Sequence, residues 1–317
     1  MSPATVSRVL NGIRVTPGNK EAVRAAAEEL SFSPNRTARS LRRRSSEVIA
    51  LVIPDIENPF FTALARGVED RLRDAGYSLV LCNTDDDPGT EAKYLEIAMS
   101  ENMAGVILVP ASDHTDLSPL LSRGKPVVAV DRSTGHNVDE VKMENRAAAR
   151  SATGALIKAG HRRIAFIAGP RGIETADERT QGWRDALIMR TGQASDHYLR
   201  HANYRVQGGR EAMTDLLALP DPPDAVVVAN NLMGVGALQV LSEAGRTPPA
   251  FGVAIVGDIP FTTLDPTTVT IVRLPARHLG VTAATLLLDR INGDTQPPRS
   301  IVLRNELVEA SGEPTDK

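Results

Sequence analysis

From about residue 47 onward, short apolar segments alternate with amphipathic ones, and this alternation limits the chain to few architectures. Segments such as "VIALVIP", "YSLVLCN", "GVILVPA" and "PVVAVD" form a first run, and "IAFIAGP", "DAVVVAN", "VAIVG" and "VTIV" form a second. Strands that are apolar throughout are typical of parallel sheets covered by helices on both faces. The two runs therefore predict an α/β fold with two doubly wound parallel-sheet lobes. A ligand is expected in the cleft between the lobes, at the carboxyl ends of the strands.

Polar and aromatic residues follow several of the predicted strands. They are Asn58, Phe60 and Phe61 in "DIENPFF", Asp131 and Arg132 in "VAVDRS", Arg179 in "TADERTQGW", Asn230 and Asn231 in "VVVANN", and Asp258 in "VAIVGD". Aromatic rings stack on sugar faces, and carboxylates, amides and guanidinium groups form paired hydrogen bonds with vicinal hydroxyls. Five junctions share this chemistry, which favours a sugar site. Taken singly, each is also compatible with helix capping (Asn58, Asn231), lobe packing or a surface ion pair.

The first 46 residues differ from the rest because they are basic and predicted to be helical. Residues 1–44 contain nine Lys and Arg against three Asp and Glu, and the remainder contains 27 against 36, within a net charge of −3. Ser2-Pro3, Thr16-Pro17 and Ser33-Pro34 each place a hydroxyl N-cap before a proline suited to the first helical position. A basic head on an acidic body indicates a polyanionic partner for the head alone.

The third helical segment of the head, "SPNRTARSLRRR", has few apolar residues and would be marginal as a helix in water. Its arginines recur at helical spacing, so we expect it to fold against DNA with these side chains on phosphates. Leu41 is then a candidate wedge between base steps of the minor groove.

Composition excludes several other classes of protein. One cysteine, Cys82, rules out a disulfide framework within the chain and is expected to be buried in a strand. No apolar run approaches the roughly 20 residues of a membrane span, and no signal peptide precedes the head, so a cytoplasmic protein is expected. "GVGALQ" lacks the third glycine of a dinucleotide turn, no "GKS" or "GKT" loop occurs, and the histidines are scattered. We therefore expect no enzyme activity, no cofactor and no metal.

Several of these motifs together resemble one family. "TVSRVLNG", the alanine-rich helix after it, "FSPNRTARSL", and the body from "VIALVIPDIENPFF" to "ELVEASGE" are similar to the lactose-repressor/galactose-repressor (LacI/GalR) family of bacterial transcription regulators. The resemblance implies a helix-turn-helix and hinge helix over 1–46, before an effector-binding and dimerisation core over 47–317 of the type I periplasmic-binding-protein fold. It implies an N-lobe of about 47–145 and 275–302 and a C-lobe of about 146–274 and 303–317.

The family's function carries over as an expectation. It is a ligand-responsive repressor that binds a pseudo-palindromic operator in double-stranded DNA as a homodimer, with a small effector, a sugar or sugar derivative, in the cleft. The DNA-contacting positions implied are Ser2, Pro3, Ala4, Thr5, Ser7, Arg8, Asn11, Asn35, Arg39 and Leu41. The effector positions implied are Asn58, Phe60, Phe61, Asp131, Arg132, Arg179, Tyr204 and Asn230, with Asp258 as a further candidate.

The chain departs from the family pattern in three places. The helix that precedes the recognition helix is missing, so we expect the native start upstream of Met1; the alternative is a real truncation that leaves the head unable to fold. "VGDIPF" is two residues short, and Leu274 stands where glutamine is common, which argues against the ordinary sugar specificity. Two alternatives stay open at this point: an effector-binding protein that does not bind DNA, and a sugar-binding transport component.

Overall fold

The chain divides into two compact units, which are described separately. The computed structural model describes residues 1–10, 14–30, 46–259 and 268–310. The head is Met1–Glu47 and the body is Val48–Lys317. The predicted hinge helix and four of the predicted DNA-contacting residues, Asn11, Asn35, Arg39 and Leu41, lie outside the described residues.

Two helices make up the described part of the head, α1 (Pro3–Leu10) and α2 (Pro17–Glu29), and Val23 of α2 is buried. Ser2 is an N-cap as predicted, because its Oγ accepts a hydrogen bond of 3.2 Å from the N–H of Thr5. The same expectation is wrong for Thr16, whose side chain makes no capping bond in the described structure although Pro17 follows it.

The N-lobe contains a parallel sheet of six strands in the order β11-β5-β4-β3-β1-β2. Its strands are β1 (Val48–Ile53), β2 (Ser78–Asn83), β3 (Gly105–Leu108), β4 (Val127–Val130), β5 (Asp139–Met143) and β11 (Ser300–Leu303). Helices α4 (Pro59–Asp74) and α11 (Ala276–Ile291) pack on one face. Helices α5 (Pro88–Ser100) and α6 (Ser118–Leu121) pack on the other, which completes the layers expected for a doubly wound sheet.

The C-lobe repeats this plan with the strand order β12-β10-β9-β8-β6-β7. Its strands are β6 (Ile164–Ala168), β7 (Leu199–His201), β8 (Ala225–Val228), β9 (Gly252–Val256), β10 (Thr270–Arg273) and β12 (Glu306–Val308). Its helices are α7 (Asn145–Lys158), α8 (Glu174–Thr191), α9 (Val206–Leu217) and α10 (Asn231–Glu243), with a short 3-10 helix, η1 (Asp196–Tyr198). The predicted all-parallel sheet needs one correction, because β12 runs antiparallel to β10.

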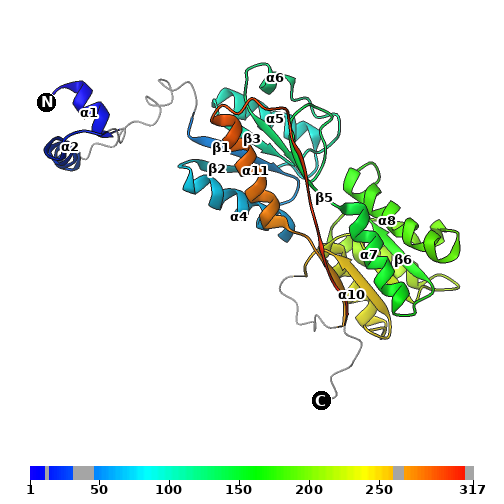
Figure 1. Ribbon diagram of the computed structural model, residues 1–317. Coiled ribbons are helices and arrows are strands. Elements are labelled where there is room, and N and C mark those ends of the chain that lie inside the picture. The colour runs from blue at the N-terminus through cyan, green and yellow to red at the C-terminus, as the bar shows by residue number, and fades with distance from the viewer. Residues whose placement is uncertain (11–13, 31–45, 260–267, 311–317) are drawn as a thin grey trace, which may run out of the picture. The chain divides into compact units, whose positions relative to one another are not determined.

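The two lobes are joined by three passages of the chain, after β5, after β10 and after β11 (Figure 1). The passage after β10 leads into α11, which lies beside α4 (Figure 1). These two helices approach closely because Gly67 and Gly280 have no side chain. A Cβ at Gly67 would collide with the carbonyl of Arg277, and one at Gly280 with the carbonyl of Leu64.

Strand β2 lies at the edge of the N-lobe sheet and is less completely covered by helices than we expected. Cys82 is buried as predicted. Val80 and Leu81 are 39% and 38% exposed, so the expectation that helices cover both faces of every strand is wrong here. The difference arises because an edge strand lies partly beyond the helices that cover the centre of the sheet. Within the described residues, no helix is long and apolar enough to cross a membrane.

Candidate functional site

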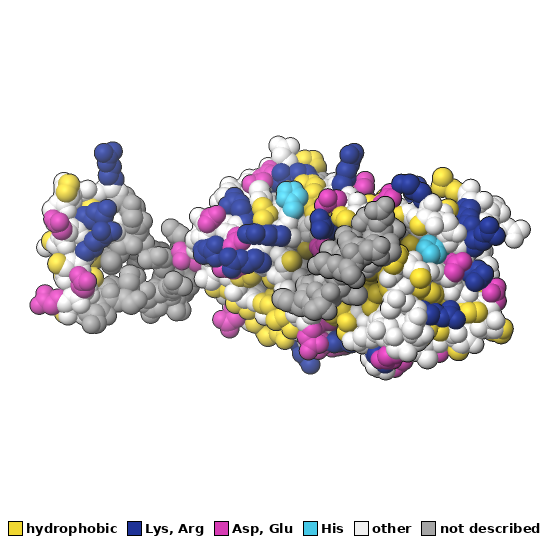
Figure 2. Space-filling view, turned by 90° about the horizontal axis from the view of Figure 1, so that it is seen from below, with side chains coloured by type: hydrophobic (Ala, Val, Ile, Leu, Met, Phe, Trp, Pro, Cys, Tyr) yellow, Lys and Arg dark blue, Asp and Glu magenta, His cyan; other side chains and the backbone are white. Residues whose placement is uncertain are grey.

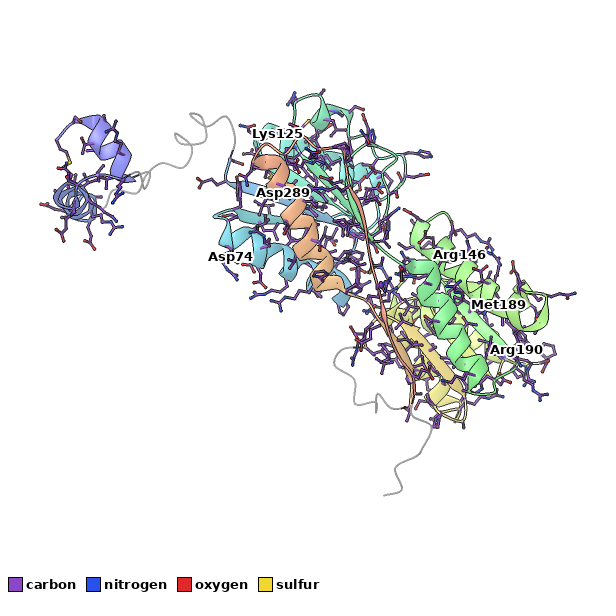
Figure 3. All side chains as sticks on the ribbon, viewed as in Figure 1. Asp74, Lys125, Arg146, Met189, Arg190 and Asp289 are labelled. Atoms are coloured by element: carbon purple, nitrogen blue, oxygen red, sulfur yellow. The ribbon has the colours of Figure 1, made fainter. Side chains whose placement is uncertain are left out.

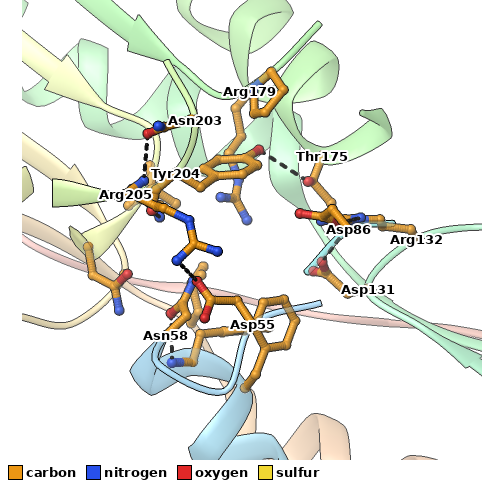
Figure 4. Close-up of a pocket in the computed structure, with 18 of the residues that line it drawn as sticks. Asp55, Asn58, Asp86, Asp131, Arg132, Thr175, Arg179, Asn203, Tyr204 and Arg205 are labelled. Carbon is orange, nitrogen blue, oxygen red and sulfur yellow. Dashed lines mark hydrogen bonds and ion pairs between the residues drawn. The ribbon is translucent and has the colours of Figure 1, made fainter. Parts of the chain in front are cut away.

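A cavity of about 300 Å³ lies between the two lobes, where the carboxyl ends of strands from both sheets meet. Eight of the nine predicted effector residues line it (Figure 4). They are Asn58, Phe60, Phe61, Asp131, Arg132, Arg179, Tyr204 and Asn230. Except for Asp258, the residues singled out by the strand-end pattern thus lie at one place in the body.

Asp131 and Arg132 follow β4 and supply buried charges that the protein itself only partly satisfies. Arg132 donates from Nη1 to Asp86 Oδ1 at 2.7 Å and to the Pro110 carbonyl at 3.1 Å. In the described part of the chain, neither Asp131 Oδ1 nor Arg132 Nε has a hydrogen-bond partner. Unsatisfied buried polar atoms are costly, so this pair is prepared to bind a ligand that both donates and accepts.

The backbone at Asp131 is in the left-handed region, with φ of +68°. Aspartate and asparagine tolerate this conformation better than most residues, because their short side chains bond locally. Burial raises the pKa of Asp131 above its ordinary value, although the nearby Arg132 and Arg179 act in the opposite direction.

Arg179 reaches the cavity from α8 and is held by two bonds. Its Nε donates to Asn145 Oδ1 at 2.9 Å, and its Nη1 donates to the Ala229 carbonyl at 2.7 Å. These bonds fix the plane of the guanidinium group beside the cavity, which limits the side-chain entropy that a ligand would have to remove.

Asn230 and Tyr204 are linked to each other on the C-lobe side. Asn230 caps α10, since its Oδ1 accepts from the Met233 N–H at 2.9 Å, and its Nδ2 donates to the Tyr204 carbonyl at 2.8 Å. Asn230 is therefore the cap of this helix, and the expectation that Asn231 caps it is wrong, because Asn231 is already helical.

The ring of Tyr204 lies against the backbone of Gly169, where any Cβ would collide with it. Its hydroxyl lies 3.4 Å from Thr175 Oγ1 (Figure 4), and burial raises the pKa of this phenol. The ring is thus fixed as an uncharged wall of the cavity.

Asn58, Phe60 and Phe61 enter the cavity from the N-terminus of α4. Asn58 is the N-cap, as expected, and its Oδ1 accepts from the Phe60 N–H at 3.0 Å. The two phenylalanine rings pack edge to face with centroids 5.1 Å apart. Phe61 is buried in the N-lobe core, whereas Phe60 is partly exposed toward the cleft.

Arg205 connects the lobes at this site and was not predicted. From the loop before α9 it lies 3.5 Å from Glu57, 3.4 Å from Asp85 and 3.9 Å from Asp55, all on the N-lobe. Asp86, the partner of Arg132, was also missed. Asp85 and Asp86, the first two residues of "DDD", follow β2, so the strand-end rule could have found them.

Asp258 does not line this cavity. It borders a second cavity beside it, with its Oδ1 3.5 Å from Arg273 Nε. Among the described residues, no group of three or more His, Cys, Asp and Glu could hold a metal ion.

In the head, the described candidate side chains are Ser2, Ala4, Thr5 and Arg8. Ser2, Ala4 and Arg8 are exposed, and Thr5 is partly buried. Pro3 and Ser7 also belong to α1, but their side chains are not among those that the structure describes. Figure 2 shows dark blue Lys and Arg side chains on the head together with acidic ones.

The geometry defines a two-lobed binding protein with a polar cleft, and comparison with known proteins identifies its family. Residues 46–310 match the family described as "Periplasmic binding proteins and sugar binding domain of LacI family". The transcriptional regulator CelR of Thermobifida fusca is 35% identical over 96% of this chain and 92% of its own length. The ribose operon repressor of Halalkalibacterium halodurans is 34% identical over 92% of this chain and 87% of its own length.

A solved structure described as a complex of the regulator CelR with cellobiose superposes with a TM-score of 0.75. It is 33% identical and covers 98% of this chain and 96% of its own length. The chain belongs to the LacI family. It is a ligand-responsive, DNA-binding transcriptional repressor, as the resemblance implied, and the relatives named here are regulators rather than enzymes.

Proposed function

We propose that the effector is an uncharged sugar bound in the cleft between the lobes and contacted by Asp131, Arg132 and Arg179. The observation that carries this is the buried pair of unpartnered atoms, Asp131 Oδ1 and Arg132 Nε. A hydroxyl donates to the first and a neighbouring hydroxyl or ring oxygen accepts from the second, which is the pattern of a sugar edge.

The charges around the cavity support a neutral ligand. Its lining carries four acidic residues, Asp55, Asp85, Asp86 and Asp131, and three basic ones, Arg132, Arg179 and Arg205. Most of these are already paired with one another, so no excess positive charge remains to attract a phosphorylated compound. The names of two relatives suggest ribose and the glucose disaccharide cellobiose as first candidates.

A thermal-shift screen of the full chain against sugars and purines tests this proposal. A ligand present at 100 times its Kd stabilises the folded state by about 2.7 kcal/mol, which is easily detected. We expect at least one neutral sugar to raise the melting temperature. Stabilisation by a purine and by no sugar would reject the sugar assignment.

The repressor is further proposed to act as a homodimer in the cytoplasm, without enzyme activity. Edge strand β2 and helix α5 expose large apolar side chains on the N-lobe, namely Val80, Leu81 and Ile97. Exposed strand edges and apolar patches of this kind are typical of surfaces that pair with another chain. A two-fold dimer would present two heads to a pseudo-palindromic operator.

Replacing Val80 and Ile97 together with aspartate is expected to convert the dimer to a monomer at micromolar concentration. Two buried charges would have to be desolvated in the interface. Sedimentation velocity gives the readout. Met189→Asp is the matched control, because Met189 is 81% exposed at the far end of α8 (Figure 3) and should leave the dimer intact. A double variant that sediments as the native chain does would place the interface elsewhere.

The head is proposed to bind operator DNA through α1, with Arg8 on a phosphate, Pro3 and Ala4 near base edges, and Ser2, Thr5 and Ser7 beside them. Arg8 is exposed and lies on α1 with Pro3, Ala4, Thr5 and Ser7, and Ser2 is the N-cap of this helix. Asn11, Asn35, Arg39 and Leu41 are proposed as further DNA contacts.

Arg8→Ala is therefore expected to weaken binding to all DNA sequences and to reduce the slope of log K against log salt by about one. This slope can be measured by fluorescence anisotropy at salt concentrations from about 50 to 200 mM. Lys158→Ala, on the exposed surface of the body, is the control and should leave the slope unchanged. An unaltered slope for the Arg8 variant would remove this phosphate contact.

A further inference from the structure

A second cavity, of about 360 Å³, adjoins the effector cavity on its α11 side. The two cavities share four lining residues, Phe60, Asn231, Gly257 and Leu274. The space available to a ligand is therefore divided by a few side chains and continues beyond them.

Of the four residues that both cavities share, two are apolar, one is a glycine, and only Asn231 is polar. Gly257 contributes no side chain and has a φ of +111°, a backbone conformation that other residues rarely adopt. Leu274 and Phe60 are partly exposed and have no polar group that would need a ligand atom at this boundary. Leu274 and the described residues Gly257 and Asp258 of "VGDIPF" line this second cavity, so two of the three sequence departures include residues at this place.

The second cavity combines an apolar wall with a polar edge. The wall comes from Pro59, Ala63, Pro275 and Ala276, whereas Asp258 and His278 are exposed at the edge. Arg277 also borders the cavity, but its Nη2 is bonded to Asp70 Oδ2 at 2.6 Å. An apolar surface with hydroxyl acceptors beside it suits a pyranose ring, which has an apolar C–H face and a rim of hydroxyls.

We propose that the effector is a disaccharide whose first ring lies against Asp131 and Arg132 and whose second ring lies beyond Phe60 and Leu274, beside Asp258. This rests on the proposed function, since it assumes a sugar effector, and it names the size class of that sugar. A ligand of one ring leaves the second cavity empty and gains nothing from its apolar wall. Burial of the second ring then supplies additional affinity.

Titration calorimetry on the full chain with D-ribose, D-glucose, cellobiose and maltose tests the proposal. One disaccharide is expected to bind at least about tenfold more tightly than either monosaccharide. Ala63→Trp fills the second cavity from α4 and should abolish that advantage while leaving monosaccharide affinity unchanged. If the tryptophan variant does not fold, Ala63→Met can be used in its place. Methionine adds less volume, so this variant should remove only part of the affinity advantage of the disaccharide.

Thr62→Trp is the matched control, because Thr62 is exposed on the same helix and lines neither cavity. It should retain the full preference for the disaccharide. A monosaccharide that binds as tightly as both disaccharides, or an Ala63→Trp variant with native disaccharide affinity, would overturn this inference and leave the sugar effector standing. Failure of all four sugars to bind would overturn the sugar effector together with it.

Discussion

Replacing Asp131 with asparagine is expected to lower the affinity for the sugar effector by about 10- to 100-fold. The side chain keeps its size, and asparagine tolerates the left-handed backbone found at this position, with φ of +68°. The substitution removes a buried carboxylate that accepts a hydrogen bond from a sugar hydroxyl, and hydrogen bonds to charged groups contribute about 1.5–3 kcal/mol. Titration calorimetry with the best sugar measures the change. Asp113→Asn, at an exposed site, is the control.

The effector affinities of the native chain and of Asp131→Asn should also depend differently on pH. The ionised carboxylate of Asp131 accepts a stronger hydrogen bond from a hydroxyl group than the protonated acid does, and burial raises the pKa of this group above its ordinary value. Native affinity should therefore fall as the pH is lowered through that raised pKa, and the asparagine variant should show no such fall. Equal affinities for the native chain and Asp131→Asn at every pH would remove Asp131 from the binding site.

Replacing Asp139 with alanine is expected to reduce the free energy of unfolding by about 3–5 kcal/mol, the largest stability effect anticipated in the body. Its fully buried carboxylate accepts from Arg290 Nε at 2.7 Å and Nη2 at 2.9 Å, and from the Arg299 N–H at 2.7 Å. Removing the carboxylate takes away the acceptor of these three bonds and the only acidic side chain that the described structure pairs with the largely buried Arg290. Because Asp139 begins β5 beside the loop that carries Asp131, the loss should also weaken effector binding.

Urea unfolding of the full chain measures this loss. Asp185→Ala is the comparison, because Asp185 pairs with the largely exposed Arg146 (Figure 3) and its removal should cost under about 1 kcal/mol. A similar, small loss for both variants would contradict the account of Asp139.

The contribution of Asp139 to the free energy of unfolding should depend on pH, in a direction set by the pKa shift of its carboxyl group. Burial alone would raise the pKa of Asp139, but the bonds from Arg290 and Arg299 outweigh it and hold the pKa below its ordinary value. A lowered folded-state pKa gives stability that is present above the unfolded-state pKa and is lost as the pH falls through the folded-state value. The stability difference between native chain and Asp139→Ala should therefore shrink in acid.

Much of the site could be predicted because it follows from topology. Parallel strands bring their carboxyl ends to one edge of a sheet, so residues such as Asn58, Asp131 and Asn230 converge once the strands are recognised. Tyr204 was not found in this way, because the short strand before it, β7 (Leu199–His201), was not among the predicted strands, and only the family resemblance indicated it. Asp258 also follows a strand, but it borders the second cavity. The position of a residue after a strand therefore predicts the edge of the sheet at which it lies, but not which of the two neighbouring cavities it lines.

The remaining features depend on contacts between elements that a pattern does not reveal. Arg205 contacts Glu57 and Asp85 only because the two lobes face each other, and no spacing in the sequence links them. The exposure of Val80 depends on β2 being an edge strand, although Val80 lies in an apolar run, "LVLC", like those of the central strands. The cap at Asn230 in place of Asn231 is a shift of one residue, within the usual uncertainty of helix boundaries.

The most direct test of the account is to measure how a cleft-bound sugar changes operator affinity. Fluorescence anisotropy of the full chain on DNA from upstream of its own gene, at fixed salt, gives this affinity with and without the sugar that stabilises the protein. A repressor controlled by a sugar in the cleft should bind this DNA at least about 10³-fold more tightly than unrelated DNA, and the sugar should shift that affinity. The Asp131→Asn variant should bind the DNA normally but not respond to the same concentration of sugar. Weak, sequence-independent binding in every ligand state, or a normal sugar response by the variant, would contradict it.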